Sequence, residues 1–466
     1  MDEIGKRLLA SGIISEKELK QALERQQKHG GRLGQNLVAL GCLNNETLGK
    51  FFSVHPPPPK TVEETGLSIP FIADLIVKHI IAMGEFMLAD VAEVTKLPVF
   101  VVAEVMEYLR RDKLVEVKGG TGFATVTYTF KISETGLKRG NELMEICRYA
   151  GPAPVTLEAY SEMVKVQTIK NIVVSEESVK KAFSHLILNE MLLKRLGPAI
   201  SSGKALFFYG PPGNGKTAIA ETIGKIMPDT IYIPYAITVG GQIITLFDPI
   251  NHVPAGPDDE FGEIDQRWLR IKRPVVMTGG ELTLRMLDLY FNPISKYYEA
   301  SLQMKANNGV FIADDFGRQQ IEPQKFLNRW IVPLERRVDF MNLHTGMMFV
   351  IPFDMLVIFA TNIDPKELVD EAFLRRIRYK IKIGRPSVEE YEEIFKMECR
   401  ANKIAFNREI FDYLLNTYYK GNNAGFNACH PRDIIDHIVD SARYYNKAPQ
   451  MTKESIDMAW QNYFVN

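Results

Sequence analysis

Residues 210–217 have the sequence Gly-Pro-Pro-Gly-Asn-Gly-Lys-Thr, which follows the apolar run 205–209 and precedes the helix-like pattern 218–223. Glycines in such a loop allow backbone N–H groups to close around an anion, next to the positive end of the following helix. An ordinary Gly/Pro turn is the alternative, but every fixed position of the motif is present in the order strand, loop and helix. The sequence therefore predicts a phosphate-binding loop in an α/β domain.

The loop predicts ATP as its ligand. The Lys216 ammonium group is long enough to reach the β- and γ-phosphates, and the Thr217 hydroxyl is a suitable ligand for Mg²⁺. Backbone groups at the other positions are expected to surround the phosphates. The expected ATP-binding residues of the loop are Gly210, Pro211, Pro212, Gly213, Asn214, Gly215, Lys216 and Thr217.

Two later apolar runs end in polar side chains, the first in the pair Asp314-Asp315 and the second in Asn362. Strands of this kind lie deep in a sheet, so Asp314 is expected to complete the Mg²⁺ shell beside Thr217. Asp315 is expected to polarise the attacking water. Asn362 is expected to hold that water near the γ-phosphate, although Thr-Asn is also an ordinary start of a loop.

Three arginines are candidates for finishing the site. Arg375 and Arg376 follow a short helical pattern, and Arg432 lies at the start of a later helix. Guanidinium groups stabilise the charge that develops on a transferred phosphoryl group, and a neighbouring subunit can supply them. We expect Arg375 and Arg376 to act in this way and Arg432 to contact the γ-phosphate, with surface turns as the alternative.

Composition excludes some classes of protein. The chain has 466 residues, which is long enough for several domains. Its net charge of −1 gives no global electrostatic field that would attract nucleic acid or anionic lipid. Its four scattered cysteines predict reduced thiols, which suits the cytoplasm. The acidic start and the lack of a long uncharged apolar stretch predict neither a signal peptide nor membrane insertion.

The N-terminal region contains an internal repeat, because residues 3–26 realign on residues 32–55. Each copy predicts a short helix, a glycine turn and a second helix. Ser15 and Glu18 form a predicted capping box at the start of one of these helices. Four prolines at 56–59 then predict an extended spacer.

The next region has the element order of a winged helix. Helical patterns at 69–83, 88–95 and 99–111 precede two β-rich segments, 114–118 and 124–132, that flank a glycine-rich tip. The helix at 99–111 would be the recognition helix. Its candidate outward side chains are apolar or acidic, whereas base and phosphate contacts need Arg, Lys, Asn or Gln. A protein partner is therefore favoured over nucleic acid.

Farther along, apolar strand candidates alternate with helices, which predicts a mostly parallel α/β sheet followed by a small helical lid. The strand candidates are 205–209, 230–234, 275–278, 309–313 and 355–360. The expected domains are a helical repeat domain at 1–54, a proline-rich linker at 55–65, a winged helix at 66–150, a second linker at 151–165, the α/β domain at 166–384 and the lid at 385–466.

The motifs of the α/β domain and lid resemble those of AAA+ ATPases. The resemblance implies a P-loop core, hydrolysis of ATP, a ring that is usually hexameric, and mechanical work on a macromolecule. The family usually has Asp-Glu where this chain has Asp314-Asp315, so a nucleotide-gated scaffold with weak hydrolysis is an alternative. Residues 247–283 are expected to form an inserted hairpin or loop. The matching blocks are Gly210–Thr217 (Walker A), Ile312–Asp315 (Walker B), Phe359–Asn362 (sensor 1), Asp370–Ile377 (arginine finger) and Pro431–Asp433 (sensor 2).

The N-terminal repeat resembles the N-terminal domain of type II secretion and type IV pilus ATPases, through Arg32-Leu33-Gly34-x-x-Leu37-Val38-x-x-Gly41-x-Leu43. In part of that family the repeat binds cyclic di-GMP. The resemblance implies that Arg32 would bind guanine or phosphate, with the leucines packed on the base. Glu3 and His55 stand where the pattern has Arg and Gln, which favours a protein-docking domain over a ligand site.

Taken together, these patterns predict a bacterial, cytoplasmic AAA+ ATPase that remodels a protein complex, with a client in pilus or secretion machinery implied by the N-terminal resemblance. Two alternatives to this interpretation stay open. One is the nucleotide-gated scaffold with weak hydrolysis, and the other is a DNA-associated regulator that acts through the winged helix.

Overall fold

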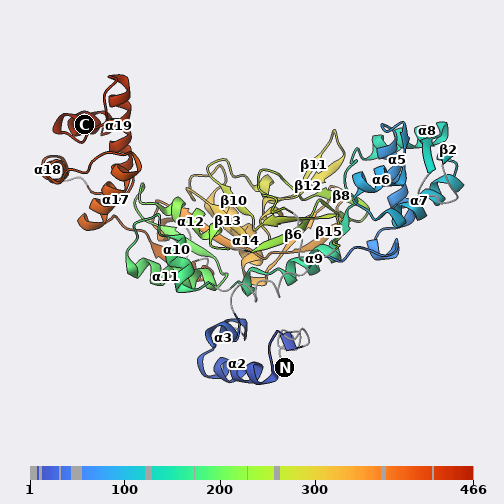
Figure 1. The fold of residues 1–466 in the computed structure, drawn as a ribbon, viewed down its shortest axis with the longest axis horizontal. Coiled ribbons are helices and arrows are strands. Elements are labelled where there is room, and N and C mark those ends of the chain that lie inside the picture. The colour runs from blue at the N-terminus through green and yellow to red at the C-terminus, as the bar shows by residue number, and fades with distance from the viewer. Residues whose placement is uncertain are drawn as a thin grey trace.

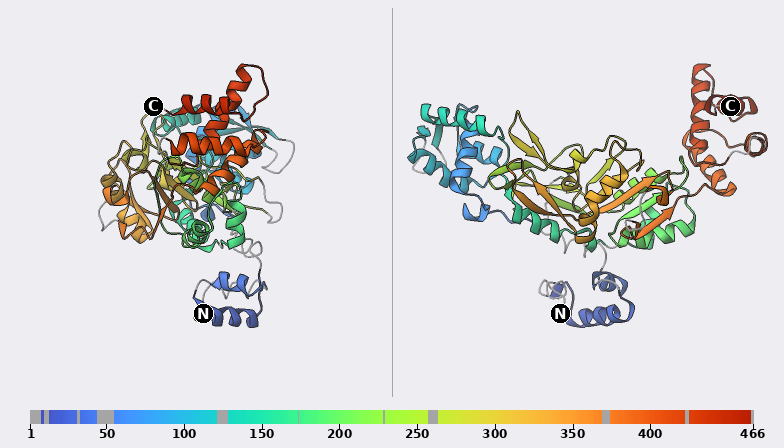
Figure 2. Two further views of the ribbon diagram at one scale, coloured as in Figure 1. Left: turned by 90° about the vertical axis from the view of Figure 1, so that its left-hand side faces the viewer. Right: turned by 180° about the vertical axis from the view of Figure 1, so that it is seen from behind.

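The computed structural model describes residues 8–9, 13–30, 33–43, 55–120, 128–172, 174–227, 229–256, 263–368, 374–421 and 425–464. The described residues form N-terminal helices, a helix–sheet unit, a central α/β region and a C-terminal bundle of helices (Figure 1). The central region lies between the helix–sheet unit and the C-terminal bundle, which Figure 2 shows from two further sides.

Five parallel strands form the main sheet of the central region. The strand order is β10-β13-β16-β5-β17, and every neighbouring pair is parallel. β17 was not among the expected strands, because its alternating lysines and edge position leave only one of its side chains buried. The strands are β5 (Leu206–Tyr209), β10 (Val275–Thr278), β13 (Val310–Ala313), β16 (Leu356–Thr361) and β17 (Tyr379–Lys382).

Helices cover both faces of the main sheet. Phe207 packs in one core with Phe326 and Trp330, whereas its neighbours Leu206 and Phe208 pack in a second core on the opposite face. This alternation follows from the two-residue period of a strand. The helical segments of this region are η3 (Ile169–Asn171), α10 (Glu176–Ala182), α11 (Glu190–Ser201), α12 (Lys216–Lys225), η4 (Leu284–Leu287), α13 (Leu302–Lys305), α14 (Pro323–Arg336) and α15 (Pro365–Leu368).

A second five-stranded sheet has the order β11-β12-β8-β7-β4. Two further antiparallel pairs, β6 with β9 and β14 with β15, belong to the same region of the chain. The prediction that 230–234 joins the main sheet is wrong, because this strand pairs antiparallel with β9. A short apolar run satisfies either sheet, so the sequence could not decide between them. The strands are β4 (Val155–Thr156), β6 (Thr230–Pro234), β7 (Ala236–Val239), β8 (Gln242–Thr245), β9 (Trp268–Lys272), β11 (Tyr290–Asn292), β12 (Tyr297–Glu299), β14 (Val338–Asn342) and β15 (Met348–Pro352).

The helix–sheet unit has a small antiparallel sheet of order β1-β3-β2 beside its helices. It contacts the second sheet, where the Arg148 N–H donates to the Ser295 carbonyl at 2.9 Å and the Tyr149 and Tyr297 rings meet edge to face. Its elements are η1 (Glu63–Thr65), α5 (Ile69–Ile80), β1 (Glu85–Phe86), α6 (Leu88–Thr95), α7 (Val99–Arg111), β2 (Val115–Gly120), β3 (Tyr128–Ile132) and α8 (Glu134–Ile146).

Both expected linkers are packed against the central region. Residues 151–165 contribute β4 and most of α9 (Leu157–Val166), whose Tyr160 is buried in the core of the second sheet. In the proline-rich segment, Pro56 is buried and its carbonyl accepts a hydrogen bond from the Asp265 N–H. Residues 151–165, which were expected to form a linker, therefore belong to a core, because side chains such as Tyr160 pack there. The spacer expected at the four prolines lies in no helix or strand but contacts the central region.

The N-terminal helices are α2 (Glu16–His29) and α3 (Leu33–Ala39). The predicted capping box is present, with the Glu18 N–H donating to Ser15 Oγ and the Ser15 N–H donating to the Glu18 carboxylate. Leu8 and Leu37, which occupy the same position in the two repeats, are both buried in one small core. Residues 44–54, which belong to the second copy of the repeat, lie outside the described residues.

The C-terminal bundle contains α17 (Val388–Ala401), α18 (Arg408–Tyr413), η5 (Leu414–Lys420), α19 (His430–Tyr444) and α20 (Lys453–Tyr463). The helix expected at 408–419 is divided, since η5 is a π-helix. No helix in the described part of the chain combines the length and the apolar character needed to cross a membrane.

Candidate nucleotide-binding site

Three loops meet at the carboxyl edge of the main sheet, because β13, β16 and β5 are consecutive neighbours there. The loop after β5 runs into α12, and the loops after β13 and β16 carry the predicted acidic and amide side chains. Together with the C-terminal bundle they line a cavity of about 530 Å³. Its lining includes every loop residue from Pro212 to Thr217, and also Asp314, Asp315, Asn362 and Arg432.

The glycine loop has the backbone shape that an anion site requires. Gly210, Gly213 and Gly215 have φ values of 137°, 72° and 81°. A Cβ atom on Gly210 would lie 2.1 Å from the Ile383 carbonyl oxygen, so no other residue fits there without a shift of the backbone. Gly215 caps the N-terminus of α12, which directs the positive end of the helix dipole toward the cavity.

Lys216 lies inside this loop and is only 7% exposed. Its Nζ donates hydrogen bonds to the carbonyls of Gly210 at 2.9 Å and Pro211 at 2.8 Å, two residues that do not themselves line the cavity. Burial lowers the pKa of Lys216, and the charges of Asp314 and Asp315 oppose that shift. The loop therefore holds one cation beside two carboxylates.

The predicted acidic pair and amide line the same cavity as this cation. The Thr217 hydroxyl donates to Asp314 Oδ2 at 2.9 Å, and Asn362 Nδ2 donates to Asp315 Oδ1 at 3.2 Å. Asp315 has a φ of 46°, in the left-handed region that costs a non-glycine residue about 1 kcal/mol. The structure thus brings together side chains from three segments that lie far apart in sequence.

The three arginines are placed differently. Arg432 lines the cavity from α19 and pairs with Asp433 at 3.2 Å. Arg376 forms an ion pair with Glu335 at the end of α14, and Arg375 is exposed. Neither Arg375 nor Arg376 lines the cavity of its own chain.

One wall of the cavity was missed by the sequence motifs. It consists of Leu186, Ile187 and Leu188, which lie between α10 and α11, and of Ile394 and Met397 on α17. These side chains give the cavity an apolar surface that suits a flat heterocycle beside the polar phosphate loop. Three consecutive apolar residues outside any regular element were the only available signal.

Glu398 also lines the cavity and was not predicted. Burial raises the pKa of Glu398, and the charge of Asp436 adds to that effect, while Arg432 opposes it. A carboxylate on α17 is suited to accept hydrogen bonds from hydroxyl groups of a sugar.

The suggested ligand site of the N-terminal helices is described only in part. Arg32 lies outside the described residues. Leu33 is 2% exposed and packs in the small core with Leu37, so its side chain already has neighbours, and Gly34 follows it in α3.

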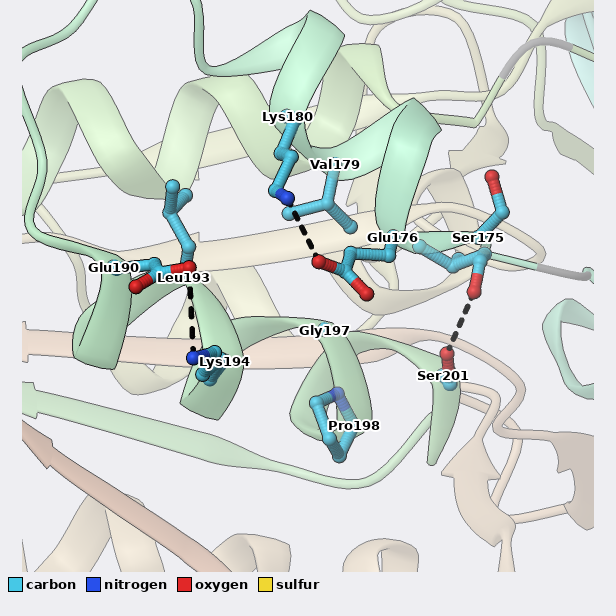
Figure 3. Close-up of a pocket in the computed structure, with 11 residues that line it drawn as sticks. Ser175, Glu176, Val179, Lys180, Glu190, Leu193, Lys194, Gly197, Pro198 and Ser201 are labelled. Atoms are coloured by element: carbon cyan, nitrogen blue, oxygen red, sulfur yellow. Dashed lines mark hydrogen bonds and ion pairs between the residues drawn. The ribbon is translucent and has the colours of Figure 1, made fainter.

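A second cavity of about 320 Å³ lies between α10 and α11 (Figure 3). Its charged side chains pair along their own helices, Lys180 with Glu176 at 2.8 Å and Lys194 with Glu190 at 3.5 Å. Figure 3 shows that the two pairs lie on different helices that line the cavity, so each lysine has its charge offset by a glutamate of its own helix. This cavity lacks the convergence of unlike polar groups that marks the first one.

Comparisons with known proteins match parts of this chain. A family described as a domain of unknown function, DUF8689, matches residues 387–462, which hold the helices of the C-terminal bundle. No match was found among curated proteins.

Among solved structures, the chain is similar to NtrX from Brucella abortus in complex with ADP, with 12% identity and a TM-score of 0.37 over 60% of this chain. That match spans 56% of NtrX, so just over half of its length. The chain is also similar to the Thermotoga maritima RuvB Holliday junction branch migration motor, with 13% identity and a TM-score of 0.34 over 65% of this chain and 74% of RuvB. At these values the likeness is remote, and the proposed function rests on the residues of the cavity.

Proposed function

We propose that this chain is a Mg²⁺-dependent ATP hydrolase of the AAA+ type. The observation that carries the proposal is the convergence of Lys216, Thr217, Asp314, Asp315 and Asn362 on one cavity at the carboxyl edge of a parallel sheet. Ligands of open α/β sheets bind at this edge. The apolar wall beside the loop supports adenine, and the loop itself supports a phosphate chain.

The oxygen atoms at the site suit Mg²⁺. Thr217 Oγ1 and Asp314 Oδ2 are 2.9 Å apart. Both are hard oxygen ligands, which Mg²⁺ prefers. When bound, the ion would neutralise charge on the phosphates. Within the described residues no group of three or more His, Cys, Asp or Glu side chains is arranged to hold a metal, so the nucleotide and water would supply the remaining ligands.

The protein side chains divide the remaining work. Lys216 provides positive charge for the β- and γ-phosphates, replacing its present carbonyl partners. Asp315 orients and polarises the attacking water, and Asn362 fixes the Asp315 carboxylate through their hydrogen bond. Arg432 approaches the γ-phosphate from the C-terminal bundle, which we propose acts as a lid.

We further propose a ring of subunits. Arg375 and Arg376 lie after the sensor-like strand β16 but do not reach the cavity of their own chain. This placement supports a role at the site of a neighbouring subunit, as arginine fingers do. ATP hydrolysis per subunit should then rise steeply with protein concentration. A rate that stays flat and near zero despite assembly would favour the weakly hydrolysing scaffold.

The site itself is tested by ATP affinity. Lys216→Ala should weaken binding of a fluorescent ATP analogue by about 100-fold or more, because charge-assisted bonds to the phosphates are lost. Lys225→Ala is the matched control, since Lys225 ends the same helix and is exposed. Equal affinity in Lys216→Ala and wild type would mean that ATP does not bind here.

For the helix–sheet unit we propose a winged helix that docks a protein. On α7 the exposed side chains include Phe100, which is 53% exposed, and the acidic Glu104 and Glu107. Negative charge on the helix that would enter the major groove opposes binding to phosphates. Salt-dependent binding of duplex DNA by the full chain at low ionic strength would support the DNA-associated alternative instead.

For the N-terminal helices we propose protein docking, with a component of pilus or secretion machinery as the client. The burial of Leu33 supports docking over cyclic di-GMP, because a buried leucine is not free to stack on a base. Calorimetric titration with cyclic di-GMP is the test, and heat of binding that Arg32→Ala removes would overturn this choice.

A further inference from the structure

The phosphate loop is hydrogen-bonded directly to the C-terminal bundle. The Ala428 N–H donates to Asn214 Oδ1 at 3.1 Å, and the Cys429 N–H donates to the Gly213 carbonyl at 2.8 Å. The packing is close, because a Cβ atom on Gly213 would lie 2.5 Å from Cys429 Sγ. The two contacts attach the middle of the loop to the segment that leads into α19.

Asn214 connects this contact to the loop itself. It is 5% exposed, and its Nδ2 donates to the carbonyls of Pro211 at 3.2 Å and Pro212 at 3.0 Å, and also to Asn427 Oδ1 at 3.3 Å. The backbone N–H of Ala428 fixes which end of the Asn214 amide is the oxygen, since an N–H needs an acceptor. The same side chain therefore shapes the loop and binds the bundle.

The hydrogen bonds continue into the bundle core with a defined direction. Because Asn427 Oδ1 faces Asn214, its Nδ2 faces His430 Nε2 at 3.2 Å and donates to it. The proton of a neutral His430 then lies on Nδ1, which donates to the Tyr419 hydroxyl at 2.8 Å. The Tyr419 hydroxyl also lies 2.6 Å from the Tyr391 hydroxyl, and either of the two can donate this bond.

The neutral state of His430 agrees with its surroundings. The residue is 5% exposed, and burial lowers the pKa of His430 to about 4. From Asn214 through Asn427 and His430 to the Tyr419 hydroxyl, every donor thus has an acceptor in one consistent direction. Reversing the Asn427 amide would place donor against donor at Asn214 and acceptor against acceptor at His430.

We propose that Asn214 and Asn427 form a latch, oriented by His430, that couples the position of the bundle to the shape of the phosphate loop. The inference rests on the proposed nucleotide site and assigns its regulation. Asn427 and His430 are positioning residues, because they act on nucleotide through Asn214. A loop held by the bundle presents its N–H groups in one geometry, whereas a released loop must be ordered by the nucleotide at a cost in affinity.

A double-mutant cycle on ATP affinity tests the coupling. Asn427→Ala should weaken binding of the fluorescent ATP analogue about tenfold, the value of one buried hydrogen-bonded pair. Asn214→Ala should cost more, because it also removes the bonds to Pro211 and Pro212. The double variant should bind as Asn214→Ala does, since the latch is already lost. Effects that multiply would overturn the proposal.

Two further variants separate positioning from simple stability. His430→Gln keeps an acceptor toward Asn427 and a donor toward Tyr419, so it should retain nearly wild-type affinity, whereas His430→Phe should match Asn427→Ala. Asn416→Ala is the control, because this exposed residue of the bundle bonds only locally with Lys420 in the described contacts. A loss of affinity in Asn416→Ala equal to that in Asn427→Ala would overturn the proposal.

The rate at which a thiol reagent modifies Cys429 tests the latch without nucleotide. The background is Cys42→Ser/Cys147→Ser, and Cys399 is fully buried. Asn427→Ala should raise the rate severalfold, because Cys429 packs on the loop. If wild type fails to bind ATP, the proposed function fails, and this rate still decides the latch. Equal rates in wild type and Asn427→Ala would overturn it.

Discussion

Polar side chains lie at both ends of the strands of the main sheet, but their hydrogen bonds differ. The amino edge is the side where the parallel strands begin, and the carboxyl edge is the side where they end. At the amino edge, the carboxylate of Asp354 is 9% exposed and accepts hydrogen bonds from Thr168 Oγ1, the Ile169 N–H and Asn308 Nδ2, each at 2.9 Å. At the carboxyl edge, Asp314 accepts a bond from Thr217, and its side chain faces the cavity.

The difference shows where bonding capacity is left for a ligand. An ionised carboxylate has about four lone-pair sites. The donors around Asp354 attach the segment between α9 and α10 to the starts of β13 and β16, so this carboxylate stabilises the fold. Asp314 and Asp315 keep capacity toward the cavity, which favours binding and catalysis.

The largest effect is expected at the amino edge. Asp354→Ala should lower the free energy of unfolding by about 3–5 kcal/mol, because several buried donors lose their acceptor at once. Asp364→Ala, an exposed aspartate in the loop after β16, is the control and should change it by less than about 1 kcal/mol. Chemical denaturation measures both. A small effect of Asp354→Ala would mean that the hydrogen bonds of this carboxylate do not stabilise the fold.

At the carboxyl edge the effect should fall on turnover and leave stability unchanged. Asp315→Asn should reduce ATP hydrolysis about 100-fold, because an amide cannot polarise water as a carboxylate does. Its ATP affinity and its denaturation midpoint should match those of wild type. A loss of stability like that of Asp354→Ala would remove the distinction between the two edges.

The C-terminal bundle holds a buried titratable group, His430, that contacts the phosphate loop through Asn427. The pKa of His430 is held near 4 by burial, below the value of about 6.5 in unfolded chains. Between these pH values the unfolded chain binds a proton that the folded chain excludes. The bundle should therefore lose stability as the pH falls from about 6.5 to about 4, by at most about 3 kcal/mol.

Unfolding followed by the fluorescence of Trp460, which lies in the core of the bundle, measures this loss. His430→Gln should flatten the dependence over the same pH window, since glutamine does not titrate. An equally steep dependence in His430→Gln would assign the effect to other groups.

The smallest predicted effect is a gain. Asp315→Glu should raise turnover by up to about tenfold, because the longer side chain reaches farther from a backbone held at a φ of 46°. Steady-state hydrolysis at saturating ATP measures it. No gain would indicate that the aspartate is already well placed, which would count against the weakly hydrolysing scaffold.

The same contrast explains what sequence could predict. The residues of the carboxyl edge belong to short motifs, so Lys216, Asp314 and Asn362 could be assigned before their proximity was known. Asn308 and Asp354 lie beside apolar runs without belonging to a known motif, and nothing in their spacing indicates that they meet. The apolar wall, including Ile187 and Met397, was missed because its residues belong to no motif and come from two segments that are distant in sequence.

Elements that depend on local pattern were predicted well. The helix at 99–111 and the capping box at Ser15 are confirmed, because helix periodicity and capping are set by neighbours in sequence. The pairing of β6 with β9 and the packing of 151–165 depend on distant partners. Strand 230–234 was expected in the main sheet and residues 151–165 were expected to be a linker. A short apolar run does not specify its partner, so the sequence could not show these contacts.

The most direct test of the central claim is the effect of Mg²⁺ on ATP affinity in wild type and Asp314→Asn, with Asp364→Asn as control. We predict that Mg²⁺ strengthens ATP binding in wild type and in the control, and that Asp314→Asn loses most of that gain while remaining folded. If Mg²⁺ strengthens binding equally in all three proteins, the carboxyl edge of the main sheet is not the Mg²⁺–ATP site.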